Sequence, residues 1–160
     1  MYRALNRHSA ALYKSWIDES FPTYRSKVIP FGSDWLGRVW ATTLGQSESD
    51  SMVYLFDPAD DSHSVPSTFE SVNDGEFSEH GERALLHSLF AEWLGGDPSD
   101  LGYTDCAGYK VSPILGGTVS ADNLERTDMS VNWHLMSQIR EQAQELSPGT
   151  TISGVSISDQ

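Results

Sequence analysis

A stripe of apolar side chains between residues 129 and 146 constrains the fold more than any other feature of the sequence. Its members recur at steps of three and four residues, as on the buried face of an amphipathic helix: Met129, Trp133, Met136, Ile139, Ala143 and Leu146. Asp128 stands where a residue that caps the first turn is expected, and Pro148 with Gly149 supplies a stop signal. We therefore expect a helix capped by Asp128, with Trp133 and Met136 in the core.

A short apolar run at residues 111–115 precedes this helix. It has the length of one buried strand and is too short to cross a membrane. Gly116 and Gly117 follow it and permit a chain reversal, because neither residue carries a Cβ. Residues 106–139 therefore predict a strand, a glycine turn, a polar loop and the capped helix.

A second amphipathic helix is predicted over residues 3–18. Its apolar face would hold Leu5, Ser9, Leu12, Tyr13, Trp16 and Ile17. The helix should end at Phe21, because a residue before proline avoids helical backbone angles. Its basic residues, Arg3, Arg7 and Lys14, are expected to form a solvated face rather than an arm that binds nucleic acid.

Three short strands of an antiparallel meander are predicted at residues 38–43, 52–57 and 62–66. The second strand is continuously apolar at its centre, which indicates a strand covered on both faces.

Two helices should follow the three strands. The first is short and begins at a capping box formed by Ser67 and Glu70. The second is longer, begins after Ser78 and ends at Gly95 and Gly96. Its buried side would consist of Leu85, Leu86, Leu89, Phe90, Trp93 and Leu94. This order predicts a single α+β domain with a mostly antiparallel sheet and helices packed against it.

The net charge of −13 is concentrated in the middle third of the 160-residue chain. Residues 48–105 contain fourteen acids and one base, Arg83, while the remaining nine acids and nine bases cancel. This balance argues against nucleic acid or an anionic membrane as a direct ligand, because both attract positive charge. The acidic segment would attract a basic partner, although the same charges could serve only to keep the protein in solution.

The single cysteine, Cys106, excludes an intrachain disulfide and fits a reducing compartment. The sequence has no run of 18 apolar residues and no basic segment leading into an apolar one at its start. We therefore expect a cytoplasmic protein.

No group of residues predicts a metal or cofactor site. The five histidines are scattered and lack the HxH or HExxH spacing of a zinc site. Asp57, Asp60 and Asp61 lack the residue order of a calcium-binding loop and are expected to form a solvated acidic turn.

A catalytic role is also not favoured by the sequence. Cys106 lies between an acidic loop and an apolar run, where a small buried side chain is expected rather than a nucleophile. Glu125 and Asp128 could serve as acid and base, but helix capping and ion pairing with Arg126 or Lys110 explain them more simply. The chain is therefore expected not to be an enzyme.

A series of short motifs in a definite order resembles a known family. The motifs are Asp34-Trp35-Leu36-Gly37-Arg38, Leu55-Phe56-Asp57-Pro58, Cys106 with Gly108-Tyr109-Lys110, Leu115-Gly116-Gly117, Asn123-Leu124-Glu125 and Asp128-Met129 followed by Trp133. Together they resemble the C-terminal domain of bacterial type VI secretion immunity proteins, whose members neutralise DNase toxins. Ser112 stands where the family carries proline, and Pro113 follows one residue later.

The resemblance covers residues 28–152 and implies an immunity-protein-like domain there. Residues 1–27 would be an N-terminal helix and lead-in, and the serine-rich residues 153–160 a flexible tail. The resemblance implies a protein that occludes the basic active-site face of a nuclease.

Eight residues are candidates for binding such a partner. The acids Asp57, Asp60, Asp61, Glu76, Glu79 and Glu82 would steer it, and Trp35 and Tyr103, in predicted loops, would supply contact area. A core role is an equal alternative for each of the two aromatic residues. As alternative functions, the chain could be a regulatory or scaffold domain that binds a cellular protein, or a small hydrolase that uses Glu125 or Asp128.

Overall fold

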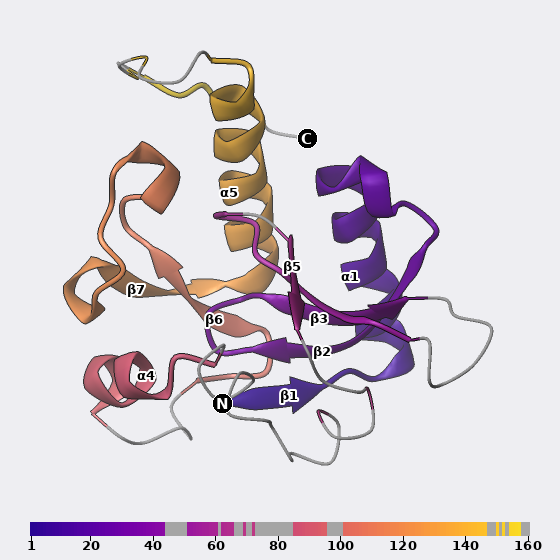
Figure 1. The fold of residues 1–160 in the computed structure, drawn as a ribbon. Coiled ribbons are helices and arrows are strands. Elements are labelled where there is room, and N and C mark those ends of the chain that lie inside the picture. Colours follow the sequence, from indigo (N-terminus) through magenta and orange to yellow (C-terminus); the bar gives the residue numbers. More distant parts are fainter. Residues whose placement is uncertain are drawn as a thin grey trace.

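The computed structural model describes residues 1–43, 51–60, 62–65, 69, 72, 85–95, 101–146, 150, 152 and 154–157. This part of the chain forms a five-stranded antiparallel sheet, a two-stranded antiparallel sheet and three α-helices (Figure 1). The predicted α+β class is confirmed. None of the helices in these residues combines the length and apolar character needed to span a bilayer.

The large sheet follows the order of the chain. Its strands are β1 (Tyr2–Ala4), β2 (Val28–Asp34), β3 (Val39–Thr43), β4 (Val53–Phe56) and β5 (Ser62–Val65), and each pairs antiparallel with the next. The predicted meander is confirmed as β3, β4 and β5. The sequence did not indicate β2, because Pro30 and Gly32 are both unusual inside strands, and the register shifts between them.

Both faces of the sheet are covered. This confirms the prediction for residues 52–57, now β4, because Val53 and Leu55 pack in one core cluster and Phe56 in another. Side chains alternate between faces along a strand, so Val39 and Ala41 point to one side and Trp40 to the other. Trp40 packs in a cluster with Val53, Leu55, Val65, Val72 and Leu85. The opposite face is covered by α1 (Arg7–Ser20) and α5 (Met129–Gln144), which stand over the same side of the sheet in Figure 1.

Helix α1 begins later than predicted, because β1 occupies the start of the chain. The side chain of Asn6 caps the helix by accepting hydrogen bonds from the backbone N–H groups of His8 and Ser9, each at 3.0 Å. The helix ends before Phe21 and Pro22, as expected, and a 3₁₀ turn, η1 (Pro22–Tyr24), follows.

The buried face of α1 is rotated relative to the prediction. It contains Ser9, Tyr13 and Ile17, whereas Leu12 is 43% exposed. The prediction that Arg3 belongs to a solvated helical face is wrong. Arg3 lies in β1, is buried, and donates hydrogen bonds from Nη1 to the carbonyl oxygens of Tyr103 and Asp105, at 3.0 and 2.7 Å.

Helix α5 matches its prediction at the N-terminus. The Asp128 carboxylate accepts hydrogen bonds from the N–H groups of Ser130 and Val131, at 2.8 and 3.3 Å. Hydrogen bonds from the Ser130 hydroxyl and from these N–H groups hold the pKa of Asp128 below its usual range. Trp133 and Met136 are buried as expected. The helix ends at Gln144, and Pro148 and Gly149 lie outside the described residues.

The second sheet corrects the position of a predicted strand. It pairs β6 (Asp105–Tyr109) with β7 (Leu124–Asp128), whereas residues 111–115 are not a strand. Pro113 has no N–H for a ladder, and the Ser112 hydroxyl accepts a hydrogen bond from the N–H of Ile114 at 3.3 Å, so a 3₁₀ turn, η4 (Pro113–Leu115), forms there. The predicted reversal follows at Gly116, whose φ is 88°. A further 3₁₀ turn, η5 (Ala121–Asn123), leads into β7.

Helix α4 (His87–Leu94) lies beside the small sheet. It ends as predicted at Gly95, which adopts a left-handed conformation with φ of 66°. Leu86, Leu89, Phe90 and Trp93 pack against a core cluster that includes Trp35, Tyr109 and Met136. The predicted start of this helix after Ser78 and the capping box of Ser67 and Glu70 lie outside the described residues.

Candidate functional site

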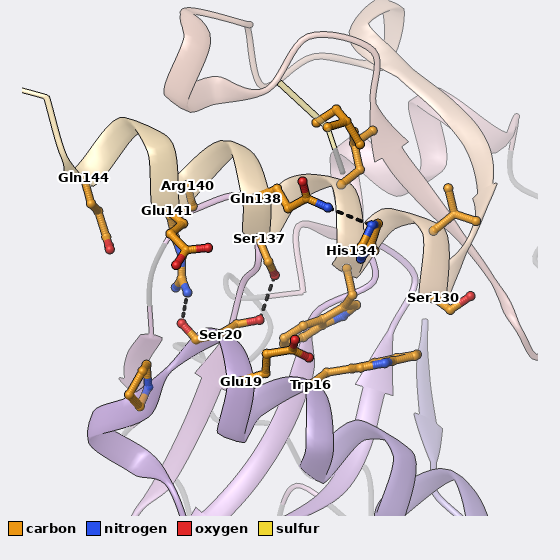
Figure 2. Close-up of a pocket in the computed structure, with 15 residues that line it drawn as sticks. Trp16, Glu19, Ser20, Ser130, His134, Ser137, Gln138, Arg140, Glu141 and Gln144 are labelled. Atoms are coloured by element: carbon orange, nitrogen blue, oxygen red, sulfur yellow. Dashed lines mark hydrogen bonds between the residues drawn. The ribbon is translucent and has the colours of Figure 1, made fainter. Parts of the chain in front are cut away.

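A groove of about 760 Å³ lies between α1 and α5 (Figure 2). Trp16, Glu19 and Ser20 contribute its wall on α1. The wall on α5 includes His134, Ser137, Gln138, Arg140, Glu141 and Gln144, and Ile157 from the C-terminal segment completes the lining. Since α1 and α5 are far apart in the sequence, only their packing on the sheet creates this site.

Aromatic stacking makes the floor of the groove rigid. The rings of Trp16 and Trp133 stack with their centroids 5.8 Å apart, and Tyr13 stacks on Trp16 at 4.6 Å. The indole N–H of Trp133 donates a hydrogen bond of 2.7 Å to the carbonyl oxygen of Gly37, in the turn between β2 and β3. Trp133 is buried, whereas Trp16 is only half-buried and lines the groove.

Hydrogen bonds join the two walls. The hydroxyl oxygens of Ser20 and Ser137 lie 2.8 Å apart, and the Arg140 guanidinium donates to the carbonyl oxygen of Ser20. Arg140 also lies over the ring of Phe21, 3.7 Å from its centroid, in a cation–π contact. Arg140 is 5% exposed, so its positive charge is used inside the protein rather than presented to solvent.

The charges that the groove presents to solvent are acidic. Glu19 on α1 and Glu141 on α5 are both exposed, one on each wall. His134 lies 2.7 Å from Gln138, measured between their Nε2 atoms, one helical turn away along α5. A rigid aromatic floor with polar walls and two carboxylates is a composition suited to binding another molecule.

The C-terminal segment lies against α5. The side-chain amide of Gln142 donates to the carbonyl oxygen of Ser156 at 2.6 Å, and the N–H of Ser156 donates back to Oε1 of Gln142 at 3.1 Å. Val155 packs against the core cluster around Trp35. Ser156 and Val155 thus contact α5 and the core, and Ile157 lines the groove. The flexibility of residues 153–160 stays a prediction.

A buried ion pair holds the turn between β2 and β3. Both Nε and Nη2 of Arg38 donate to Oδ2 of Asp34, at 2.9 and 2.7 Å, while Oδ1 of Asp34 accepts from the N–H groups of Leu36 and Arg38. Asp34 is fully buried and Arg38 almost so. Next to this pair, burial raises the pKa of Tyr109 to about 12.

Asp57, a predicted partner-binding acid, belongs to this interior charge cluster. It is half-buried, and its carboxylate accepts a hydrogen bond of 2.9 Å from the N–H of Ala59. Burial raises its pKa to about 6, although the charge of Arg38 acts in the opposite direction. Asp57 thus organises its own turn, and its carboxylate is half-buried rather than fully solvated as expected for this acidic turn.

The pH dependence of stability should reveal this environment of Asp57. The folded protein holds the Asp57 proton more tightly than an unfolded chain with the ordinary value of 3.8 does, so this group contributes stability below about pH 4 that is lost as the pH rises through about 6. In the variant Asp57→Asn, the side chain at position 57 is uncharged at every pH. Its free energy of unfolding, measured by urea titration relative to the native chain, is expected to increase from pH 4 to pH 7.

Asp60→Asn is the matched control, since it removes the same charge from an exposed neighbour. If both variants changed equally with pH relative to the native chain, the interior position of Asp57 would have no part in the effect.

Of the other predicted binding residues, the structure describes Trp35, Tyr103 and Asp60. Trp35 is fully buried and donates a hydrogen bond of 2.7 Å from its indole N–H to the carbonyl oxygen of Leu85, so it belongs to the core rather than to a partner surface. Tyr103 is 45% exposed, and its hydroxyl donates to the carbonyl oxygen of Ala4 at 3.2 Å. Asp60 is exposed. The remaining four, Asp61, Glu76, Glu79 and Glu82, lie outside the described residues.

Cys106 and Asp128, both considered for catalysis, have roles in the fold. Cys106 is fully buried, as expected, and burial raises the pKa of its thiol. Asp128 caps α5, while Glu125 is exposed on β7. Within the described residues, His, Cys, Asp and Glu side chains do not gather in any group of three or more that could hold a metal ion.

The sequence did not reveal the groove, although part of the signal was present. Glu19 and Ser20 lie three and four residues after Trp16, so both lie near it on one face of α1. On α5, His134 and Glu141 are seven residues apart and also share a face. Local spacing does not tell which two helical faces meet, so the groove could not be assigned from it.

No protein-family model and no curated protein matches this chain. A solved structure described as the crystal structure of Atu4351 from Agrobacterium tumefaciens is similar, with a TM-score of 0.51 and 15% sequence identity. The match covers 86% of this chain and 66% of that chain, slightly under two thirds of its length. At this identity the likeness concerns the fold alone.

Proposed function

We propose that this chain is an immunity protein, a non-enzymatic binder that neutralises a cognate secreted toxin in the cytoplasm of the producing cell. The toxin would be a type VI secretion nuclease of the DNase class. The observation that carries the proposal is the concentration of charge, with fourteen acids and one base in residues 48–105. The order of motifs that resembles the immunity family supports it.

The charge distribution suits an inhibitor of a nuclease. A nuclease needs positive charge around its active site to hold phosphate groups. An acidic protein that covers this site uses the same attraction and excludes the nucleic acid. Long-range attraction of this kind raises association rates by about 10 to 1,000 fold at low salt. Within the part of the acidic segment that the structure describes, Asp60 and Glu92 are exposed.

Rescue of a sensitive host tests the proposal. The neighbouring open reading frame is expressed with and without this chain, and the two proteins are then purified together. We expect the host to die without this chain and to survive with it, and a stable complex to elute. Its association rate should fall steeply when the salt concentration is raised from about 50 to about 300 mM, because charges farther apart than roughly 10 Å are screened.

Charge reversals separate steering from simple solubility. Lys in place of Asp60, Asp61, Glu76, Glu79 and Glu82 should slow association without changing the fold. An unchanged association rate would remove the acidic segment from the mechanism. Absence of both rescue and complex would contradict the proposal and favour a regulatory or scaffold domain that binds a cellular protein.

A further inference from the structure

We propose that the groove between α1 and α5 is the docking site for a basic segment of the toxin, one that carries Lys or Arg beside an apolar side chain. This inference rests on the proposed function and names the surface that would carry it out. The groove lies outside the acidic middle segment, since its lining comes from residues 16–22, 130–144 and 157.

The first argument is charge complementarity. Glu19 and Glu141 place one exposed carboxylate on each wall (Figure 2). The nearby Arg140 does not offset them toward solvent, because its guanidinium is buried between the Phe21 ring and the carbonyl oxygen of Ser20. A cationic side chain that enters from solvent therefore meets two carboxylates on a partly enclosed surface, where ion pairs are screened less than on an open one.

The second argument is the preorganised aromatic floor. Tryptophan is enriched among the residues that dominate the energetics of protein interfaces. Trp16 is already held by stacking on Tyr13 and Trp133, so its side chain would lose little conformational freedom when a partner binds. Val131, 56% exposed, adds apolar surface to the lining. These groups suit the apolar neighbour of the cationic side chain.

The third argument is size. A volume of about 760 Å³ falls within the range of roughly 300 to 1,000 Å³ that is typical of sites for small ligands. Such a groove accepts a short peptide segment rather than a domain. The rest of the toxin would contact the surrounding surface, and the acidic middle segment would speed the encounter while the groove sets the lifetime of the complex.

A paired charge reversal tests the groove. The variant Glu19→Lys/Glu141→Lys is compared with Asp122→Lys/Glu125→Lys, which changes the net charge equally at residues that do not line the groove. The probe is the purified product of the neighbouring open reading frame, and the full chain is used throughout. Both variants should slow association by a similar factor, since both alter the net charge. The groove variant should also dissociate about 100 times faster, while the control keeps its dissociation rate.

Carboxyl footprinting gives a second measurement that does not depend on variants. The native chain is labelled with a carbodiimide and glycine ethyl ester, alone and in the complex. We expect binding to protect Glu19 and Glu141 from labelling and to leave Glu125 accessible. Equal labelling of Glu19 and Glu141 in both samples would overturn the groove assignment.

The outcomes separate this inference from the proposed function. If the native chain neither rescues the host nor binds the probe, the immunity function fails and the groove proposal fails with it. If the native chain rescues and binds, but the two double variants dissociate equally fast, only the groove assignment is overturned.

Discussion

Replacing Arg38 by Met lowers the free energy of unfolding by about 3 to 5 kcal/mol, the expected cost of leaving one charge of a buried pair without its partner. Asp34 is fully buried, and Oδ2 accepts two hydrogen bonds from the Arg38 guanidinium. Met has a similar length and no charge, so the variant removes the countercharge without leaving a large cavity. Urea unfolding monitored by circular dichroism provides the measurement.

The double variant Asp34→Asn/Arg38→Met is the matched control. Its Asn side chain can still accept hydrogen bonds from the backbone N–H groups at positions 36 and 38. In the native protein the carboxylate accepts these bonds at 3.0 and 3.2 Å. Because both charges are then absent, the double variant should be more stable than Arg38→Met alone. A single variant within about 1 kcal/mol of the native protein would contradict the role of this pair.

Replacing Trp133 by Ala is also expected to lower the free energy of unfolding by about 3 to 5 kcal/mol. Trp133 is 1% exposed, and its ring contacts Trp16 and Phe21. Its indole N–H bonds to the carbonyl oxygen of Gly37, so this one side chain joins α5, α1 and the turn between β2 and β3. The substitution leaves a cavity where three elements meet. Thermal and urea unfolding both provide the measurement.

Trp133→Phe separates packing from hydrogen bonding. It keeps an aromatic ring but leaves the Gly37 carbonyl oxygen without its donor, a loss of about 1 to 3 kcal/mol. The Ala variant should therefore be clearly less stable than the Phe variant. Equal losses would indicate that the hydrogen bond, rather than the packing of the ring, accounts for the effect.

The elements predicted correctly are those whose signals lie close together in the sequence. The start of α5 follows from the Asp128 cap and the stripe through Trp133 and Met136. The end of α4 follows from Gly95, which takes the left-handed conformation that glycine tolerates. Each of these signals acts within one or two turns of helix, so neighbouring residues suffice to read it.

The errors occurred where distant residues decide the structure, or where apolar composition was given more weight than a local signal. Strand β1 exists because it pairs with β2, which begins more than twenty residues later in the chain. Residues 111–115 are apolar enough for a strand, yet the capping of Ile114 by Ser112 and the missing N–H of Pro113 favour a 3₁₀ turn, and β6 takes the place beside β7. Apolar composition alone does not distinguish these outcomes.

The predicted partner-binding residues show the same difference between local signals and tertiary packing. Sequence patterns placed Trp35 and Tyr103 in loops, and both do lie in turns, but only the folded core shows that Trp35 is fully buried. In the sequence, Asp57 stands in an ordinary acidic turn. Its proximity to Arg38 results from the pairing of β3 with β4. Loop position therefore did not predict accessibility.

The amino-acid sequence was sufficient to predict the α+β class, the capped helix α5, the meander of β3, β4 and β5, and the acidic character of residues 48–105. These features depend on composition and on periodicities of two or about 3.6 residues, which neighbouring residues encode. Two features could be seen only in the folded protein. Asp34 and Arg38 form a buried pair, and Trp16, Glu19 and Glu141 line one groove. These arrangements depend on which faces of distant elements are packed together, a choice made by burial of the whole apolar surface rather than by local sequence.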